Sequence, residues 1–86
     1  MTPNKMTPEM ISSLIASVDY LTFKTLTVCV LTLTNGAMVT GESNVIDPAN
    51  YDADIGRSMS YKDAFGKIWQ LEGYAMKRDL MKASKG

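Results

Sequence analysis

The chain has 86 residues and a formal net charge of zero, because nine Lys or Arg residues balance nine Asp or Glu residues. One cysteine and no histidine exclude an intramolecular disulfide and leave too few ligands for a metal site, and the zero net charge argues against binding to long nucleic acid. No apolar run approaches the roughly 20 residues of a membrane span, and the N-terminal residues MTPNKMTPEM lack the apolar core of a secretory signal. We therefore expect a cytoplasmic protein of one domain, residues 1–86, that gains stability from a second copy because so short a chain buries little core.

The first predicted element is a helix over residues 7–18, preceded by a flexible arm over residues 1–6. Thr7 is a good N-cap and Pro8 suits the first helical position. Apolar residues then recur at helical spacing as far as Val18, which predicts a short helix that docks on the rest of the chain.

A β-hairpin is predicted over residues 20–46. Threonine, valine and aromatic residues dominate its first half and favour a strand. Asn35 and Gly36 suit a two-residue type I′ turn, because both central positions of that turn need a positive φ. This turn would place Leu33 opposite Met38.

The first strand of this hairpin, residues 20–34, is longer than its return strand can cover. Its alternation changes phase near Thr25 and Leu26, which indicates a bulge or bend. A lone hairpin is barely stable in water. We therefore expect the uncovered edge to pair with a second copy and extend the sheet.

Residues 48–82 are predicted to be helical after a start at Asp47 and Pro48. One long helix and two helices with a kink at residues 57–60 are both open, because the apolar pattern weakens there. The expected fold class is α+β, with an N-terminal helix, an antiparallel hairpin extended by dimerisation, and a long or kinked C-terminal helix.

No catalytic constellation is present in the sequence, so we expect no enzyme activity and no cofactor. Histidine is absent, and Cys29 therefore has no histidine to activate it. Asp52 and Asp54 lie two apart, on different faces of a helix, which does not suit a shared acid and base pair.

Binding of an anionic ligand fits the residues better. Asn50, Tyr51 and Arg57 gather at a predicted helix start, where free N–H groups favour anions, while tyrosine offers a stacking face and arginine a phosphate fork. In the alternative interpretation, Tyr51 packs in the core and Arg57 forms a salt bridge with Asp54 or Asp52.

The C-terminal third is basic, since residues 57–86 hold seven cations against three anions. Lys67 and Arg78 lie close to one helical face and are candidates for phosphate contacts from a partner chain. A solvated helix face is the other interpretation of the same charges.

Two glycines flank the only tryptophan on one predicted helix face. Gly66, Trp69 and Gly73 lie on nearly the same side of a helix, and each glycine weakens the helix relative to alanine. These residues predict packing against the sheet, an interface between two copies or the close approach of a ligand.

Four motifs occur in fixed order between residues 26 and 80: V-C-x-L-T-L-x-N-G, V-T-G-E-S, D-P-A-N-Y-D-A-D-I-G-R and K-I-W-Q-L-E-G-Y. In these motifs the chain resembles a family of small phage proteins that includes or borders the Thoeris anti-defence sponge proteins, which bind cyclic ADP-ribose signals. One departure is Ala37, where the family has a larger aromatic residue.

The resemblance implies a phage protein in the cytoplasm of the infected bacterium that sequesters a cyclic ADP-ribose-type nucleotide without degrading it. It also implies homodimers that can assemble into hexamers, and further sites for cyclic oligonucleotides. Asn50, Tyr51, Arg57 and Arg78 are the residues whose chemistry suits the adenine, ribose and phosphates. The alternative is a phage protein that inhibits a host protein through its sheet edge or basic helix.

Overall fold

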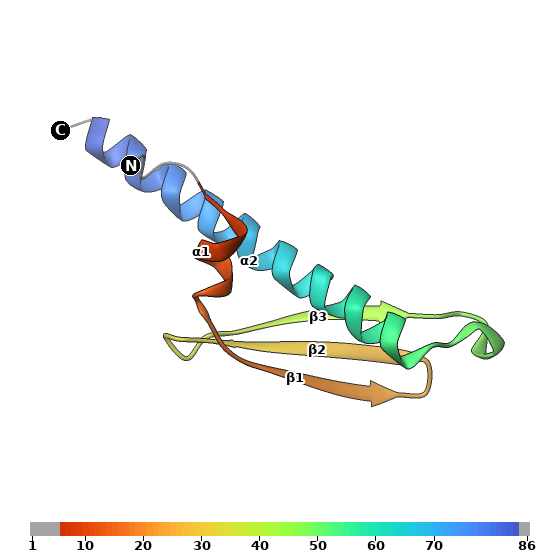
Figure 1. The fold of residues 1–86 in the computed structure, drawn as a ribbon. Helices are drawn as coiled ribbons and strands as arrows, with labels where there is room; N and C mark the ends of the chain where they lie inside the picture. The colour runs from red at the N-terminus through yellow and green to blue at the C-terminus, as the bar shows by residue number, and fades with distance from the viewer. Residues whose placement is uncertain (1–5, 85–86) are drawn as a thin grey trace.

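The computed structural model describes residues 6–84 and has an α+β fold, which confirms the predicted class. Three antiparallel strands lie in chain order, and one long helix crosses a single face of the sheet (Figure 1). The elements are α1 (Pro8–Ser12), β1 (Ile15–Phe23), β2 (Leu26–Leu33), β3 (Met38–Asn44), the 3-10 turn η1 (Pro48–Asn50) and α2 (Ala53–Ser84).

The first helix is shorter than predicted. Thr7 caps α1 as expected, since its Oγ1 accepts a hydrogen bond from the Met10 amide at 3.2 Å, but the helix ends at Ser12 rather than at residue 18. The chain joins the sheet directly afterwards, where the Thr34 amide donates to the Leu14 carbonyl at 2.8 Å. Strand pairing has therefore overridden the helical spacing.

The predicted flexible arm falls mostly outside the described residues, which exclude residues 1–5. Met6 is half-buried and packs against the hydrophobic core.

The single strand predicted over residues 20–34 is wrong. The chain reverses at Lys24 and Thr25, and Phe23 pairs with Leu26 across the turn. Lys24 has a φ of 55°, a conformation that lysine rarely adopts. The expected bulge is thus a hairpin turn, and the uncovered strand on which edge pairing between copies was based folds back as β1.

The turn between β2 and β3 has three residues instead of two. The Leu33 amide donates to the Ala37 carbonyl at 2.7 Å, and Gly36 has a φ of 90°. This geometry is that of a type I turn followed by a bulge at the left-handed glycine. The pairing therefore shifts by one residue, so that Met38 lies opposite Thr32 rather than Leu33, and Met38 points away from α2.

The C-terminal helix is continuous from Ala53 to Ser84, without the alternative kink at residues 57–60. Its N-cap is Asp52, whose Oδ1 accepts from the amides of Asp54 and Ile55. Asp47 instead caps η1 through the Ala49 amide.

Two glycines allow α2 to pack closely on β2 and β3. A Cβ on Gly41 would lie 2.1 Å from the Ser60 carbonyl oxygen, and one on Gly56 would lie 2.7 Å from Thr27 Oγ1. The core forms around this contact, with Ile11 of α1 closing one end; its fully buried hydrophobic residues are Ile11, Cys29, Leu31, Ala64 and Ile68.

Candidate functional site

The predicted ligand residues do not meet in one chain. Arg57 and Arg78 both belong to α2, and at about 1.5 Å per residue they are about 31 Å apart along the helix axis. A small ligand bound to one chain cannot contact both.

At the start of α2, the side chains and amides predicted to bind a ligand already contact neighbouring groups of the same chain. Arg57 forms an ion pair with Asp54, and the Tyr51 ring packs beside Gly56, 3.9 Å from the position of a Cβ there. The Asp52 carboxylate occupies helix-start amides that an anion would need. Asn50 ends η1 and is exposed.

Lys67 of α2 contacts the free edge of β3. Its Nζ donates to the Thr40 carbonyl at 2.7 Å and lies 3.8 Å from Asp63 Oδ2, which itself accepts from the Glu42 amide at 2.9 Å. These side chains satisfy backbone groups that an edge strand would leave open. The contacts give Lys67 a structural role.

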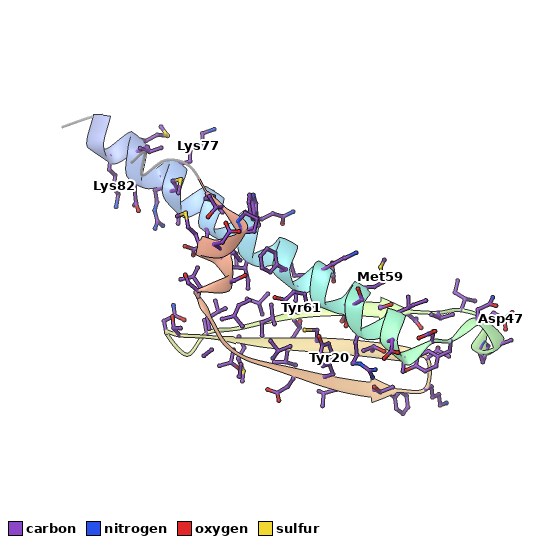
Figure 2. The ribbon with its side chains drawn as sticks, viewed as in Figure 1. Tyr20, Asp47, Met59, Tyr61, Lys77 and Lys82 are labelled. Carbon is purple, nitrogen blue, oxygen red and sulfur yellow. The ribbon has the colours of Figure 1, made fainter. Side chains whose placement is uncertain are left out.

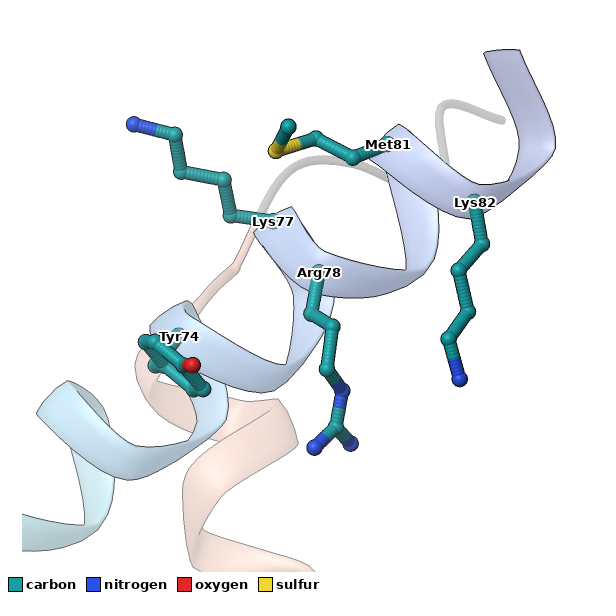
Figure 3. A pocket seen from close by; sticks show the side chains of 5 residues that line it. All are labelled: Tyr74, Lys77, Arg78, Met81 and Lys82. Carbon is teal, nitrogen blue, oxygen red and sulfur yellow. The ribbon is translucent and has the colours of Figure 1, made fainter. Parts of the chain in front are cut away.

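Arg78 lies in a different setting, because the C-terminal part of α2 extends beyond the sheet (Figure 1). Here one face of the helix carries three cations around an exposed tyrosine (Figure 3). The nearest carboxylate to Arg78 is Asp79, at 3.9 Å. We call this face the distal surface; a shallow groove of about 460 Å³ is lined by Tyr74, Lys77, Arg78, Met81 and Lys82.

The distal surface continues the side of α2 that packs on the sheet. Ser60 and Ala64 are buried there, and residues 71, 74 and 78 follow on the same side at helical spacing. Past the end of the sheet this side is open, and Tyr74 is 71% exposed. The distal surface therefore presents cations and an aromatic ring to an external ligand from one side only.

A second polar cluster joins β1 to α2, and the sequence did not reveal it. Tyr20 pairs with Cys29 across the sheet, and Tyr61 of α2 lies above Tyr20 (Figure 2). Burial, followed by the nearby Cys29 and Tyr61, raises the pKa of Tyr20, while the Arg57 charge opposes this effect. The signal in the sequence was the spacing of Val18, Tyr20 and Thr22, which places them on one face of a strand. The prediction of a helix as far as residue 18 obscured this pattern.

The predicted interface residues differ from one another. A Cβ on Gly66 would have no atom within 4 Å, whereas one on Gly73 would lie 3.6 Å from Met6 Sδ. Trp69 is 38% exposed beside a groove between α1 and α2.

Within residues 6–84, no group of three or more potential ligand side chains is arranged to hold a metal ion. In the same part of the chain, no helix has the length and apolar character needed to cross a membrane.

Comparison with known proteins gives one family. The family model described as Phage protein (N4 Gp49/phage Sf6 gene 66) family matches residues 6–80. Neither the curated proteins nor the solved structures give a match. The matched span includes the whole sheet and most of α2.

Proposed function

Because the chain belongs to the phage protein (N4 Gp49/phage Sf6 gene 66) family, we propose that it acts in the cytoplasm of the infected bacterium as an anti-defence sponge. It binds a cyclic ADP-ribose-type signalling nucleotide and sequesters it without degrading it. Binding alone removes the signal, so no chemical step is required of the protein.

The distal surface is the observation that carries this proposal. Lys77, Arg78 and Lys82 place three positive groups within about two turns of helix, enough to neutralise a doubly charged phosphate pair. Arginine binds phosphate oxygens with a planar fork, and the exposed Tyr74 ring offers a stacking face for a base. Positive groups for the phosphates and an aromatic face for the base are the two kinds of contact that such a nucleotide requires.

The distal surface contacts a ligand from one side only, so a second chain is needed to enclose it. We propose a homodimer that can assemble further into a hexamer, and that Arg57, Tyr51 and Asn50 of one copy approach the distal surface of another copy in this assembly. The ion pair between Arg57 and Asp54 is solvent-exposed, and exposed pairs of this kind cost little to rearrange.

Titration calorimetry with cyclic ADP-ribose isomers and with cyclic di- and trinucleotides tests the proposal. We expect one of these nucleotides to bind and to be recovered with unchanged mass. Arg78→Gln and Tyr74→Ala should each weaken binding by about tenfold or more, since a charge-assisted hydrogen bond or a stacked ring contributes about 1.5 kcal/mol. Lys24→Gln is the matched control, because it removes an exposed cation from the turn between β1 and β2. Loss of binding in the control, or recovery of a cleaved nucleotide, would contradict a sponge that uses the distal surface.

A second candidate function is inhibition of a host protein, favoured by the face of the sheet turned away from α2. Leu21, Phe23 and Met38 on that side are each more than 60% exposed, more apolar surface than an isolated sheet face normally leaves open. If no nucleotide of the panel binds, this function becomes the better one, and Phe23→Lys should then abolish inhibition of the host target while Arg78→Gln leaves it intact.

A further inference from the structure

α2 has a second apolar side, opposite the one that packs on the sheet. From Ile55 to Leu80, positions on this side recur at the alternating spacings of four and three residues that a pairing helix shows. They are Ile55, Met59, Lys62, Gly66, Trp69, Gly73, Met76 and Leu80. Lys62 is the one charged residue among them, and Met6 of the same chain lies beside Gly73. Met59 points away from the sheet (Figure 2). Ile55, Met59 and Leu80 are all exposed. We call this line of positions the outer seam.

Gly66 lies in the middle of the outer seam, and the fold of one chain does not require it. A Cβ there would meet nothing within 4 Å, and glycine weakens a helix relative to alanine. Beside it is an open groove of about 400 Å³, lined by Ser12, Tyr61, Lys62, Phe65, Gly66 and Trp69. The missing side chain therefore leaves room for something outside the chain.

We infer that Trp69 of a second copy fills this groove, in a two-fold dimer whose α2 helices run antiparallel along their outer seams. In an isologous interface, the inserted side chain and the groove that receives it lie on the same surface of each chain. Trp69 and Gly66 meet this condition, because they lie three residues apart on one helix face. A two-fold axis between these residues places each tryptophan over the glycine of the other chain. The same register sets Met59 opposite Met76 and Ile55 opposite Leu80, so apolar residues meet at both ends of the seam.

Charge selects the antiparallel direction. Residues 52–57 carry Asp52 and Asp54 against Arg57, a net charge of −1, whereas residues 77–82 carry Lys77, Arg78 and Lys82 against Asp79, a net charge of +2. Antiparallel helices bring the acidic start of one copy beside the basic end of the other, while parallel helices would place like charges together.

This inference rests on the homodimer of the proposed function and not on its ligand. The antiparallel seam brings the far end of α2 in one chain alongside the end that contains Arg57 in the other. The distal surface lies on the opposite side of α2 from the seam, so the seam leaves it open to a ligand.

Sedimentation velocity of the full chain and of Gly66→Leu tests the groove. We expect the unaltered protein to be dimeric at micromolar concentration, and Gly66→Leu to raise the dimer dissociation constant by about a hundredfold. Because the leucine meets open space in one chain, far-UV circular dichroism should still show a folded helix. Trp69 fluorescence should move to longer wavelength as the ring becomes hydrated. Thr40→Leu is the control: it adds the same side chain on the outer face of β3 and should leave the dimer intact.

Disulfide trapping tests the direction of the helices. Met59→Cys mixed with Met76→Cys should form a covalent heterodimer on mild oxidation, while neither variant should cross-link to itself, because like positions are about 25 Å apart along antiparallel helices. Cys29 is buried and serves in all samples as the unreactive background. A monomeric wild type, a Gly66→Leu variant that stays dimeric, or self-linking of Met59→Cys would each overturn the inference. A dimer that passes these tests but ignores every nucleotide would refute only the proposed ligand.

Discussion

Gly41 and Gly56 are the residues on which the contact between helix and sheet depends, and they should respond differently to alanine. On Gly41 the new methyl group would meet backbone atoms, 2.1 Å from the Ser60 oxygen and 2.2 Å from the Ala64 nitrogen. Backbone atoms cannot rotate away, so Gly41→Ala should lower the free energy of unfolding by about 3 kcal/mol or more.

On Gly56 the obstacle is a side chain, Thr27 Oγ1. Gly56→Ala should cost about 1 to 3 kcal/mol, and adding Thr27→Ala should restore part of that loss because the methyl group then occupies the vacated space. Guanidinium unfolding followed by circular dichroism measures both changes. If Gly41→Ala were as stable as the unaltered protein, the close packing of α2 on β3 described above would be wrong.

The buried thiol makes the protein sensitive to alkaline pH. Burial raises the pKa of Cys29 above its ordinary value of 9.0, although a hydrogen bond with Tyr20 opposes the shift. The folded state therefore holds this proton more tightly than the unfolded state. The stability that results is complete below pH 9.0 and is lost as the pH rises through the higher folded pKa.

We expect native Cys29 to react slowly with iodoacetamide at roughly pH 8 and the unfolded chain to react at the rate of a free thiol. The free energy of unfolding should also fall as the pH rises beyond 9.0. Equal labelling rates in native and unfolded protein at roughly pH 8 would contradict the protected state of this thiol.

Among the elements, β3 depends on α2 to cover its free edge. Asp63→Ala removes the acceptor of the Glu42 amide, so hydrogen exchange at that amide should accelerate by roughly fivefold, the equivalent of about 1 kcal/mol. NMR exchange rates measure this effect residue by residue. Gln70→Ala, an exposed substitution on the same helix, should leave the rate unchanged. An unaltered rate in Asp63→Ala would remove the edge role assigned to this carboxylate.

Prediction of the elements succeeded where local signals were strong and failed where tertiary contacts decided. The cap at Thr7 and the turn at Gly36 carry specific side-chain and φ requirements, and both features are present. The turn at Lys24 has no glycine, asparagine or proline, so its one signal was the change of phase near Thr25 and Leu26, which was interpreted as a bulge or bend. As a result, β1 was divided between a helix and an overlong strand.

Prediction of the candidate site also succeeded for local chemistry and failed where tertiary contacts decided. Residue chemistry identified Arg78, which lies on the open distal surface, but side chains chosen for charge alone included Lys67, which binds the β3 edge. Spacing along the sequence could not reveal that Gly41 of β3, rather than Gly73, receives the helix backbone.

At the scale of the whole molecule, the single chain is extended and thinly packed. Its radius of gyration is 15.9 Å, against roughly 12 Å for a compact domain of this length. Where side chains are described, only five hydrophobic residues are fully buried, while Phe23, Trp69 and Leu80 remain exposed. A chain with this distribution of apolar surface gains more from association than from its own core.

If association supplies a large part of the stability, the melting temperature must depend on protein concentration, because unfolding then separates two chains. A hundredfold increase in concentration adds about 2.7 kcal/mol to the stability of a dimer, which for two chains of this size corresponds to a rise of roughly 5 to 10 °C. Differential scanning calorimetry over such a range measures this shift directly. Gly66→Leu should show no shift, since a dissociated chain unfolds alone. A melting temperature that is the same at every concentration for the unaltered protein would mean that the small core alone stabilises this fold.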